Sequence, residues 1–461
     1  MDDQRQKNQP MLAFMTKERG EAPTPTPEGT ESSVAASEVE NPALCEQMME
    51  AVCQPDNLRR ALRRVMSNKG SPGVDGMTVE QMPDYLKQHW PALREQLLKG
   101  IYQPQPVLRV EIPKPDGGVR KLGIPTALDR FVQQAVLQVL QEEWDPTFSE
   151  HSFGFRPGRS THQAVACAQQ YLAEGHRWLV DLDLEKFFDR VNHDRLMSRI
   201  AGRVGDKRLL RLIRAFLNAG VMENGIVSPT EEGTPQGGPL SPLLSNLVLD
   251  ELDQELERRG HRFVRYADDC NIYVRSRRAG QRVMESLTAF ITARLKLKVN
   301  AAKSAVDRPW HRKFLGFSFT HHHQPKRRIA PKALERFKER VRELTSRTRG
   351  VSLRQMVAEL AVYLRGWRGY FSFCQTPSVL KELDRWIHRR LRSAAWKHWR
   401  TGNRRFKELH SRGTPREWAA KAASSRYGPW RMSRAPAVIQ ALTDAFFAEL
   451  GLPTLCAPIT A

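Results

Sequence analysis

The chain has 461 residues, with 73 Lys and Arg against 51 Asp and Glu, so its formal net charge is +22. This excess favours a polyanionic partner, most simply nucleic acid, over a merely soluble basic protein. We expect no membrane segment and no signal peptide, because no apolar run could span a bilayer and the N-terminus lacks the charged-then-apolar order. The six cysteines form no Cys-X-X-Cys pair, which argues against a zinc knuckle and favours reduced thiols in the cytoplasm.

The first hundred residues contain a polar extension followed by helices. Residues 1–45 are rich in Pro, Thr, Ser and Glu and are acidic, so we expect disorder there and no nucleic-acid binding. Residues 46–108 have apolar side chains at helical spacing. A glycine-rich loop at 69–76 interrupts them; composition favours a tight turn over a contact with a phosphate backbone.

A hairpin is predicted next, because an Asp-Gly-Gly turn at 116–118 separates two β-prone runs. Lys114 and Arg120 stand on either side of this turn. They could grip one triphosphate together, although solvated charges on a hairpin are the commoner fate of such residues. Residues 127–143 follow as an amphipathic helix with one apolar face, which we interpret as core.

A loop at 152–160 combines Arg156 and Arg159 with two phenylalanines. Arginine and aromatic side chains together suit stacking on, and pairing with, a nucleic-acid strand. A purely structural loop remains the alternative.

Carboxylates lie on one face of the next predicted strand. Val180 and Leu182 share one face, whereas Asp181 and Asp183 share the other. A carboxylate on a buried strand needs a compensating partner, and a metal ion is a good one.

Further on, the loop at 233–242 leads into a helix. Its Gln236 could hydrogen-bond a base or sugar, or the loop could be a plain junction.

Two adjacent aspartates, Asp268 and Asp269, are flanked by β-rich runs within residues 263–274. The pattern predicts a hairpin with the aspartates at its tip. Adjacent carboxylates repel each other unless a cation lies between them, and hard oxygen ligands suit Mg²⁺. An exposed acidic turn explains this stretch equally well by itself, but Asp183 supplies a third candidate ligand.

Helices are predicted at 332–349, 353–364 and 378–399. The third has an apolar face and a second face of basic and aromatic residues; we expect its two tryptophans to be exposed, which favours RNA binding. A charged, solvated face is the alternative. The residues of this second face are Arg385, Arg389, Arg392, Trp396 and Trp399. Trp418, Arg426, Trp430 and Arg431 are further candidates for contact with DNA or RNA.

Taken together, the ordered motifs resemble the reverse transcriptases encoded by bacterial group II introns. They are the Lys/Arg hairpin, the Asp-bearing strand ending in Phe-Phe, the Pro-Gln-Gly loop, Tyr-Ala-Asp-Asp, Lys303, and Phe-Leu-Gly-Phe at 314–317. The likeness covers roughly residues 50 to 430 and is nearest the compact class C-like group without an endonuclease domain. It implies an α+β, right-hand polymerase whose fingers and palm carry antiparallel sheet, followed by a helical thumb and maturase domain.

The resemblance also implies a two-metal site. Asp183, Asp268 and Asp269 would hold two Mg²⁺ ions, with Asp181 as an alternative ligand on the same face. Lys303 would give a proton to the leaving pyrophosphate.

A nucleotide pocket follows from the same resemblance. Lys114 and Arg120 would hold the incoming triphosphate. Phe188 would lie under its sugar and exclude a 2′-hydroxyl, which favours deoxynucleotides. Gln236 would line the same pocket.

The implied domains are a disordered extension at 1–45, an N-terminal fingers extension at 46–108, fingers and palm at 109–325, a thumb/maturase domain at 326–412 and a nucleic-acid-binding tail at 413–461. The implied function is RNA-directed DNA polymerisation, together with binding of the intron RNA for splicing and mobility by target-primed reverse transcription. The partners would be intron RNA, an RNA template and a DNA primer or target. Two alternatives are a splicing factor without polymerase activity, and a reverse transcriptase recruited to another role such as defence or repair.

Overall fold

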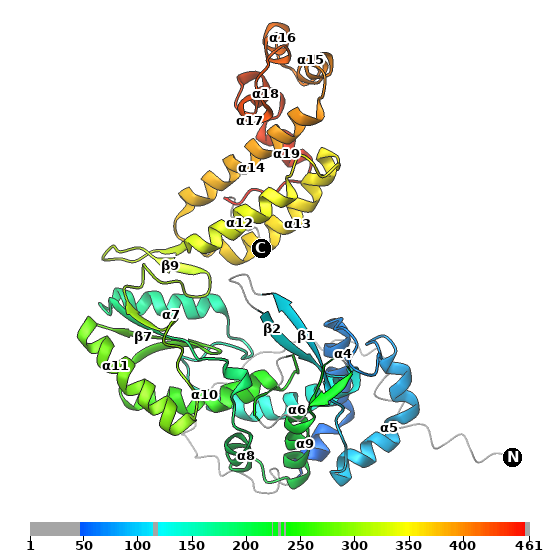
Figure 1. Cartoon of the computed structure of the whole chain (residues 1–461), viewed down its shortest axis with the longest axis vertical. Coiled ribbons are helices and arrows are strands. Elements are labelled where there is room, and N and C mark those ends of the chain that lie inside the picture. The colour runs from blue at the N-terminus through cyan, green and yellow to red at the C-terminus, as the bar shows by residue number, and fades with distance from the viewer. Residues whose placement is uncertain (1–46, 114–118, 224, 229–231, 235–236, 457–461) are drawn as a thin grey trace, which may run out of the picture. The chain divides into compact units, whose positions relative to one another are not determined.

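The computed structural model describes residues 47–113, 119–223, 225–228, 232–234 and 237–456, so the expectation for residues 1–45 lies outside it. The chain packs as two compact units (Figure 1). The first contains the residues up to 164 together with 180–306, and the second contains 165–179 and the residues from 307 onward. The packing boundary falls after residue 306, whereas the sequence placed a domain boundary after residue 325.

The N-terminal half of the first unit surrounds a mixed four-stranded sheet with the order β2-β1-β4-β5. Strand β1 pairs antiparallel with β2 and parallel with β4. The pairing of Pro113 with Val119 confirms the predicted hairpin, although its turn lies outside the described residues. The elements are α3 (Met48–Val52), α4 (Pro55–Ser67), α5 (Met82–Lys99), β1 (Val107–Pro113), β2 (Val119–Ile124), α6 (Ala127–Trp144), η1 (Asp145–Thr147), α8 (His193–Ala201), α9 (Lys207–Asn218), β4 (Val221–Glu223) and β5 (Ile226–Ser228).

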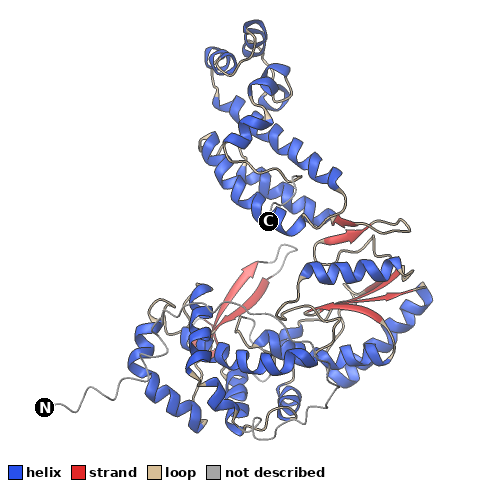
Figure 2. Cartoon of the chain, turned by 180° about the vertical axis from the view of Figure 1, so that it is seen from behind, coloured by secondary structure: helices blue, strands red, loops and turns tan. Residues whose placement is uncertain are grey.

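A second four-stranded sheet, with the order β6-β7-β3-β8, carries the predicted aspartates. Helix α10 packs on β6 and α11 packs on β7, so consecutive residues of both strands are buried (Figure 2). Burial on both faces explains why these strands contain apolar runs as well as alternation. The elements are α7 (Thr161–Ala173), β3 (Trp178–Leu182), η2 (Phe187–Asp189), α10 (Ser241–Arg258), β6 (Arg262–Tyr266), β7 (Asp269–Val274), α11 (Arg277–Phe290), the π-helix η3 (Ile291–Leu295) and β8 (Ala305–Asp307).

The second unit is almost entirely helical. A two-stranded antiparallel sheet of β9 and β10 precedes the helices. The predicted apolar face of the helix at 378–399 is confirmed, since Leu380, Leu383, Ile387, Leu391 and Ala394 are all buried. The elements are β9 (Phe317–Phe319), β10 (Arg327–Ile329), α12 (Pro331–Leu344), α13 (Leu353–Phe371), α14 (Pro377–His398), α15 (Gly402–His410), α16 (Arg416–Ala423), α17 (Pro429–Met432), α18 (Pro436–Ala441) and α19 (Asp444–Glu449).

The C-terminal residues share the core of these helices. Val438, Phe447 and Leu455 belong to the same hydrophobic cluster as residues of α12, α13 and α14. Phe447 stacks on His388 of α14, with 5.5 Å between the ring centroids. Residues 419–455 are therefore part of a folded domain with α14, whereas the sequence predicted a separate tail from residue 413.

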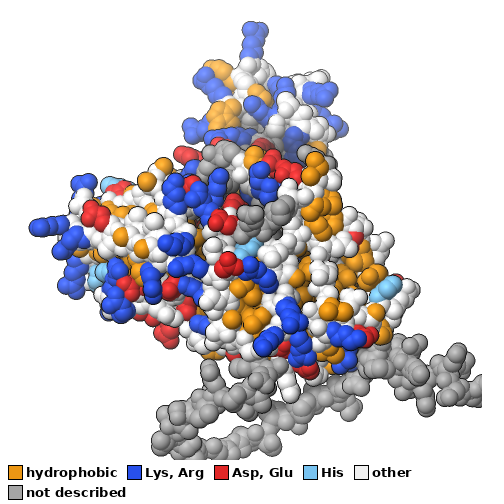
Figure 3. Space-filling view, turned by 60° about the horizontal axis from the view of Figure 1, so that its bottom comes forward, with side chains coloured by type: hydrophobic (Ala, Val, Ile, Leu, Met, Phe, Trp, Pro, Cys, Tyr) orange, Lys and Arg blue, Asp and Glu red, His pale blue; other side chains and the backbone are white. Residues whose placement is uncertain are grey.

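The surface carries the charge expected from the composition. Lys and Arg side chains are prominent on the face drawn in Figure 3, where they are interspersed with fewer acidic ones. Within the part of the chain that the structure describes, no helix is both long enough and apolar enough to cross a bilayer. The cysteines in that part form no disulfide bond.

Phe447→Ala tests whether the C-terminal helices belong to the core. We expect the free energy of unfolding to fall by about 3–5 kcal/mol, because a fully buried aromatic side chain is lost. Urea unfolding of the full chain measures this. Ile439→Ala, at a side chain that is 42% exposed, is the control and should cost far less. Equal effects of the two substitutions would contradict the shared core.

Candidate active site

The predicted hairpin at 263–274 is confirmed as β6, β7 and the turn between them, which we call the aspartate hairpin. Tyr266 and Asp269 form its last antiparallel pair, so Ala267 and Asp268 make the tip. Ala267 has φ of 57°, in the left-handed region that a non-glycine residue adopts at some cost. This strain requires support from the surrounding structure.

Arg265 supplies that support from inside the hairpin. Its Nη1 donates a hydrogen bond to the Ala267 carbonyl at 3.0 Å and another to Asn246 Oδ1 at 2.9 Å. Its Nε donates to Asp253 Oδ1 at 2.7 Å, and its Nη2 donates to Ser152 Oγ, also at 2.7 Å. The side chains of Arg265 and Asp253 are completely buried. Because the guanidinium reaches four partners, it ties the hairpin tip to α10 and to the loop at residue 152.

Gly154 allows this loop to lie against the tip. A Cβ at residue 154 would stand 2.2 Å from the Ala267 nitrogen, so no larger residue fits without movement. The Phe153 nitrogen donates to the Arg265 carbonyl at 2.9 Å, which adds a backbone link to β6. The tip is therefore enclosed by backbone on one side and held by Arg265 on the other.

Asp183 directly follows β3 and is held by the loop at 298–304. Its N–H donates to Ser304 Oγ at 3.0 Å, and its carbonyl accepts from the Asn300 nitrogen at 2.9 Å. The same loop brings Lys303 to the site, where its Nζ lies 3.8 Å from Asp183 Oδ2. Sequence reasoning placed Asp183 and Lys303 in one site but missed Ser304 and Asn300, which hold them together.

Asp268 responds electrostatically to these groups. Burial raises the pKa of the Asp268 carboxyl, and the negative charge of Asp183 raises it further. Arg120 of β2 and Lys303 act in the opposite direction. Four predicted site residues therefore lie close enough to influence one another: Asp183, Asp268, Arg120 and Lys303.

Two neighbouring carboxylates, one with a raised pKa, fit a site that gains from a bound cation. Asp269 begins β7 beside them, with an exposed side chain. Among the described residues, however, no three His, Cys, Asp or Glu side chains are grouped closely enough to form a complete metal site. The three-aspartate magnesium site therefore stays a prediction.

The predicted nucleotide pocket is only partly described. Phe188 is half-buried in η2, where its ring packs edge-on against Phe187 with 5.2 Å between centroids. Its carbonyl accepts a hydrogen bond from the Thr234 nitrogen at 2.7 Å, which links Phe188 to the loop that leads to Gln236. Lys114 and Gln236 themselves lie outside the described residues.

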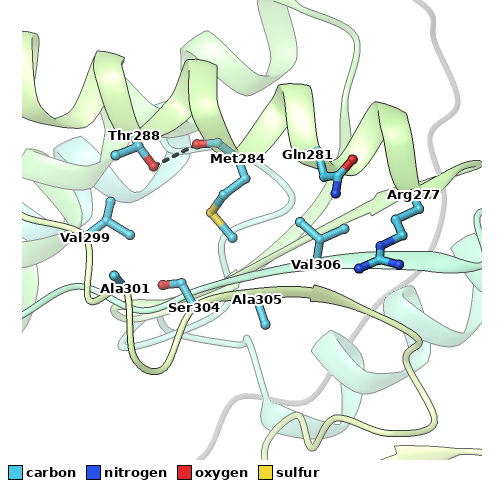
Figure 4. A pocket seen from close by; sticks show the side chains of 9 residues that line it. All are labelled: Arg277, Gln281, Met284, Thr288, Val299, Ala301, Ser304, Ala305 and Val306. Atoms are coloured by element: carbon cyan, nitrogen blue, oxygen red, sulfur yellow. Dashed lines mark hydrogen bonds between the residues drawn. The ribbon is translucent and has the colours of Figure 1, made fainter.

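A hollow of about 400 Å³ lies beside the Lys303 loop (Figure 4). Met284 and Thr288 of α11 face Val299, Ala301 and Ser304 across it. The hollow leaves part of the Lys303 loop without packing against α11. The hydrogen bonds that Ser304 and Asn300 make with Asp183 therefore contribute much of what fixes this loop.

Comparisons with known proteins identify two domains in the chain. A family model described as reverse transcriptase (RNA-dependent DNA polymerase) matches residues 112–319, and one described as group II intron, maturase-specific domain, matches residues 334–413. Protein YkfC of Escherichia coli (strain K12) is 33% identical over 301 residues, which cover 57% of this chain and 79% of YkfC.

Group II intron-encoded protein LtrA of Lactococcus lactis subsp. cremoris is 38% identical over 202 residues, which cover 44% of this chain but only 33% of LtrA. The chain belongs to the group II intron-encoded reverse transcriptase and maturase family. Among solved structures, a chain of a partial Cas6-RT-Cas1–Cas2 complex is 25% identical, covers 53% of this chain and 42% of its own length, and has a TM-score of 0.35. That similarity is too weak to support an inference.

Arg156 was predicted to contact nucleic acid, and its position requires a correction. Its side chain is only 4% exposed. It donates to Asp145 Oδ1 at 2.9 Å and to the carbonyls of Ser149 and Ser152 at 2.6 and 3.0 Å. A buried guanidinium with these partners stabilises the loop and is not presented to a strand. Arg159 is half-buried, with its guanidinium carbon 5.7 Å from the centre of the Phe153 ring.

Trp396 and Trp399, at the C-terminal end of α14, were predicted to be exposed. This prediction requires a correction, because both side chains are buried. The C-terminal helices fold against the end of α14, and Arg405 and Arg412 cover the two indole rings at 4.8 and 5.5 Å. The sequence showed no sign of this covering, since each arginine is 9 or 13 positions downstream of its indole ring, in a basic segment.

Other aromatic residues, which follow the maturase-specific match at 334–413, are exposed. Trp418, Tyr427 and Trp430 are 52%, 54% and 39% exposed. Arg389 of α14 lies 3.7 Å from the centre of the Trp430 ring, and Arg431 lies 3.6 Å from that of Tyr427. Of the predicted arginines of α14, Arg385 is exposed, Arg389 stacks on Trp430, and Arg392 pairs with Asp444.

Arg265→Leu tests the buried support of the aspartate hairpin. We expect the free energy of unfolding to fall by about 3–5 kcal/mol, because Asp253 is left buried without its cation. The double variant Arg265→Leu/Asp253→Leu removes both charges and should recover most of that loss in the same urea titration. If the double variant were less stable than the single one, the ion pair would not be the reason for the loss.

Proposed function

We propose that the chain is an RNA-directed DNA polymerase that also binds its intron RNA and promotes splicing. The observation that carries the proposal is the geometry of the site: Asp268 lies at the tip of the aspartate hairpin, and Lys303 Nζ lies 3.8 Å from Asp183 Oδ2. The charges of Asp183, Arg120 and Lys303 all act on the pKa of the Asp268 carboxyl. Acidic and basic groups at one place suit a reaction in which a metal-bound triphosphate is attacked. Membership of the family supports the same reading.

Asp183, Asp268 and Asp269 would hold two Mg²⁺ ions. When bound, these ions would activate the primer 3′-hydroxyl and neutralise charge on the reacting phosphates. The protein's own contribution is to fix the carboxylates in advance: Ser304 and Asn300 hold the backbone of Asp183, and Arg265 holds the backbone of the hairpin tip. Preorganised charges of this kind need no rearrangement when the reaction occurs.

The incoming nucleotide would meet residues from four segments of the chain. Arg120 of β2, with Lys114, would hold the triphosphate, and Lys303 would give a proton to the leaving pyrophosphate. Phe188 would lie against the sugar and exclude a 2′-hydroxyl, with Gln236 in the same pocket. Polymerisation of deoxynucleotides on an RNA template is the result we infer, and mobility by target-primed reverse transcription would use the same centre.

RNA would also be bound by exposed aromatic residues of the C-terminal helices that follow the maturase-specific match at 334–413. Trp430 and Tyr427 offer flat surfaces on which unpaired bases stack, and Arg389 and Arg431 place positive charge directly on those rings. Arg385 and Arg159 remain candidates for phosphate contacts. The cysteines, which form no disulfide among the described residues, fit a reducing compartment such as the cytoplasm.

Primer extension on an RNA template tests the polymerase proposal. Asp268→Ala should lower the rate by about 10³-fold or more, because it removes a carboxylate that would hold Mg²⁺ and so several kcal/mol of transition-state stabilisation. Glu285→Ala, at a carboxylate on α11 outside the site, serves as the control and should extend normally. Extension by Asp268→Ala at the wild-type rate, or none by the wild type with Mg²⁺ and deoxynucleotides, would exclude the proposal.

A splicing assay tests the maturase proposal. Trp430→Ala should weaken binding of the intron RNA by about 5- to 100-fold, as expected for the loss of one stacked base. The rate of protein-assisted splicing at limiting protein should fall in parallel, while primer extension is unchanged. Ile439→Ala, at a nearby exposed aliphatic residue, should leave both unaffected. Equal splicing with and without the wild-type protein would disprove the maturase role.

A further inference from the structure

The loop at residues 232–234 is attached to Phe188 by a set of close contacts that the proposed roles do not use. We propose that His193 and Gly233 form a latch that fixes the backbone of Phe188, and that selection of deoxynucleotides over ribonucleotides depends on this latch. The inference rests on the proposed polymerase function. It assigns a positioning role to two residues that do not touch the nucleotide.

His193 holds the loop at residues 232–234 through a hydrogen bond to Gly233. It is the first residue of α8, is only 3% exposed, and places its Nε2 2.6 Å from the Gly233 carbonyl oxygen. Because a carbonyl only accepts hydrogen bonds, Nε2 carries the hydrogen and donates it. The other ring nitrogen lies 3.2 Å from Asn218 Oδ1 at the end of α9. The imidazole therefore joins α8 to the loop through one hydrogen bond and lies against the end of α9.

Gly233 allows the loop to approach Phe188 closely. It has φ of +95°, in the region that favours glycine. A Cβ at this position would stand 2.8 Å from the Phe188 carbonyl oxygen and 3.0 Å from Asp189 Cα, both of them backbone atoms. Any side chain at residue 233 would push directly on the backbone that carries the phenylalanine.

Backbone hydrogen bonds close the latch on both sides of Gly233. Its own nitrogen donates to the Val191 carbonyl at 2.8 Å, and the Thr234 nitrogen donates to the Phe188 carbonyl at 2.7 Å. A bridge between Asn192 and Glu232 extends the pairing by one step. The position of the Phe188 backbone is thus set by the loop at residues 232–234.

This arrangement matters because Phe188 would select by steric overlap. Repulsion between a ring and a 2′-hydroxyl rises steeply with overlap, so a shift of a few tenths of an ångström relieves much of it. The Phe188 ring is half-buried, with an edge-on contact to Phe187, and its backbone sits in a single turn of 3-10 helix. Such a short element does not hold its position alone, and the latch supplies the external restraint.

Single-nucleotide incorporation on an RNA template tests the latch. The measured quantity is the ratio of kcat/KM for dTTP to that for UTP opposite the same template adenine. Gly233→Ala should lower this ratio by about tenfold or more, since a tenfold change corresponds to about 1.4 kcal/mol of lost discrimination, while dTTP is still incorporated. His193→Leu should act in the same direction, and His193→Gln, which keeps an N–H donor, should retain more of the ratio.

Two controls make the result specific. Gly260→Ala also places alanine at a positive φ, of +69°, but with nothing within 4 Å of the new methyl, and should leave the ratio unchanged. Phe188→Ala gives the dTTP-to-UTP ratio that is expected when the steric barrier is lost completely. If Phe188→Ala lowers the ratio while Gly233→Ala and His193→Leu do not, the latch is disproved and the polymerase proposal stands.

The remaining outcomes are also decisive. If the wild type incorporates neither nucleotide, the polymerase proposal itself fails, and the latch with it. If Phe188→Ala leaves the ratio unchanged, Phe188 is not the barrier and the latch has nothing to position, which overturns the inference. Should Gly233→Ala fail to fold, the comparison of His193→Leu with His193→Gln decides: a lower ratio for leucine only supports the latch, and equal ratios overturn it.

Discussion

The buried ion pair between Arg265 and Asp253 is the interaction on which the geometry of the aspartate hairpin depends. Burial raises the pKa of Asp253, and the Arg265 charge opposes that shift. A fully buried ion pair contributes little net stability, but a guanidinium whose N–H groups all donate hydrogen bonds defines a single geometry. Here that geometry includes the Ala267 carbonyl, in the strained residue next to Asp268. The pair therefore acts mainly by fixing the backbone of the hairpin tip beside Asp268.

A second restraint works on the other carboxylate. Asp183 is held through its backbone by Ser304 and Asn300, and the loop that supplies these contacts also supplies Lys303. The Phe188 region follows the same design, with its backbone held by the loop at residue 233. In each case the residue proposed to meet the substrate is positioned by hydrogen bonds from a segment distant in sequence, so the site depends on the complete first unit.

Local patterns predicted the hairpins, the aspartate-bearing strand and the apolar face of α14, because strand and helix periodicity are properties of neighbouring residues. The supports of the site were not predictable in this way. Arg265 is one of many basic residues in the sequence. Nothing in its neighbourhood along the chain indicates that Asp253, twelve positions earlier, neutralises it. Arg156, Trp396 and Trp399 were misassigned for the same reason: their burial is produced by segments that fold over them. The exposed Trp418 and Trp430 were identified from the sequence, but the stacking of Arg389 on Trp430 was not.

The central claim is that Asp183, Asp268 and Asp269 form the metal-binding centre of a polymerase. A structure of the chain with an RNA template, a DNA primer, an incoming deoxynucleotide and Mg²⁺ tests it most directly. The account predicts metal ions held by these aspartates, with Arg120 on the triphosphate and Phe188 against the sugar. Metal ions held by other carboxylates, or a nucleotide bound away from the aspartate hairpin, would contradict it.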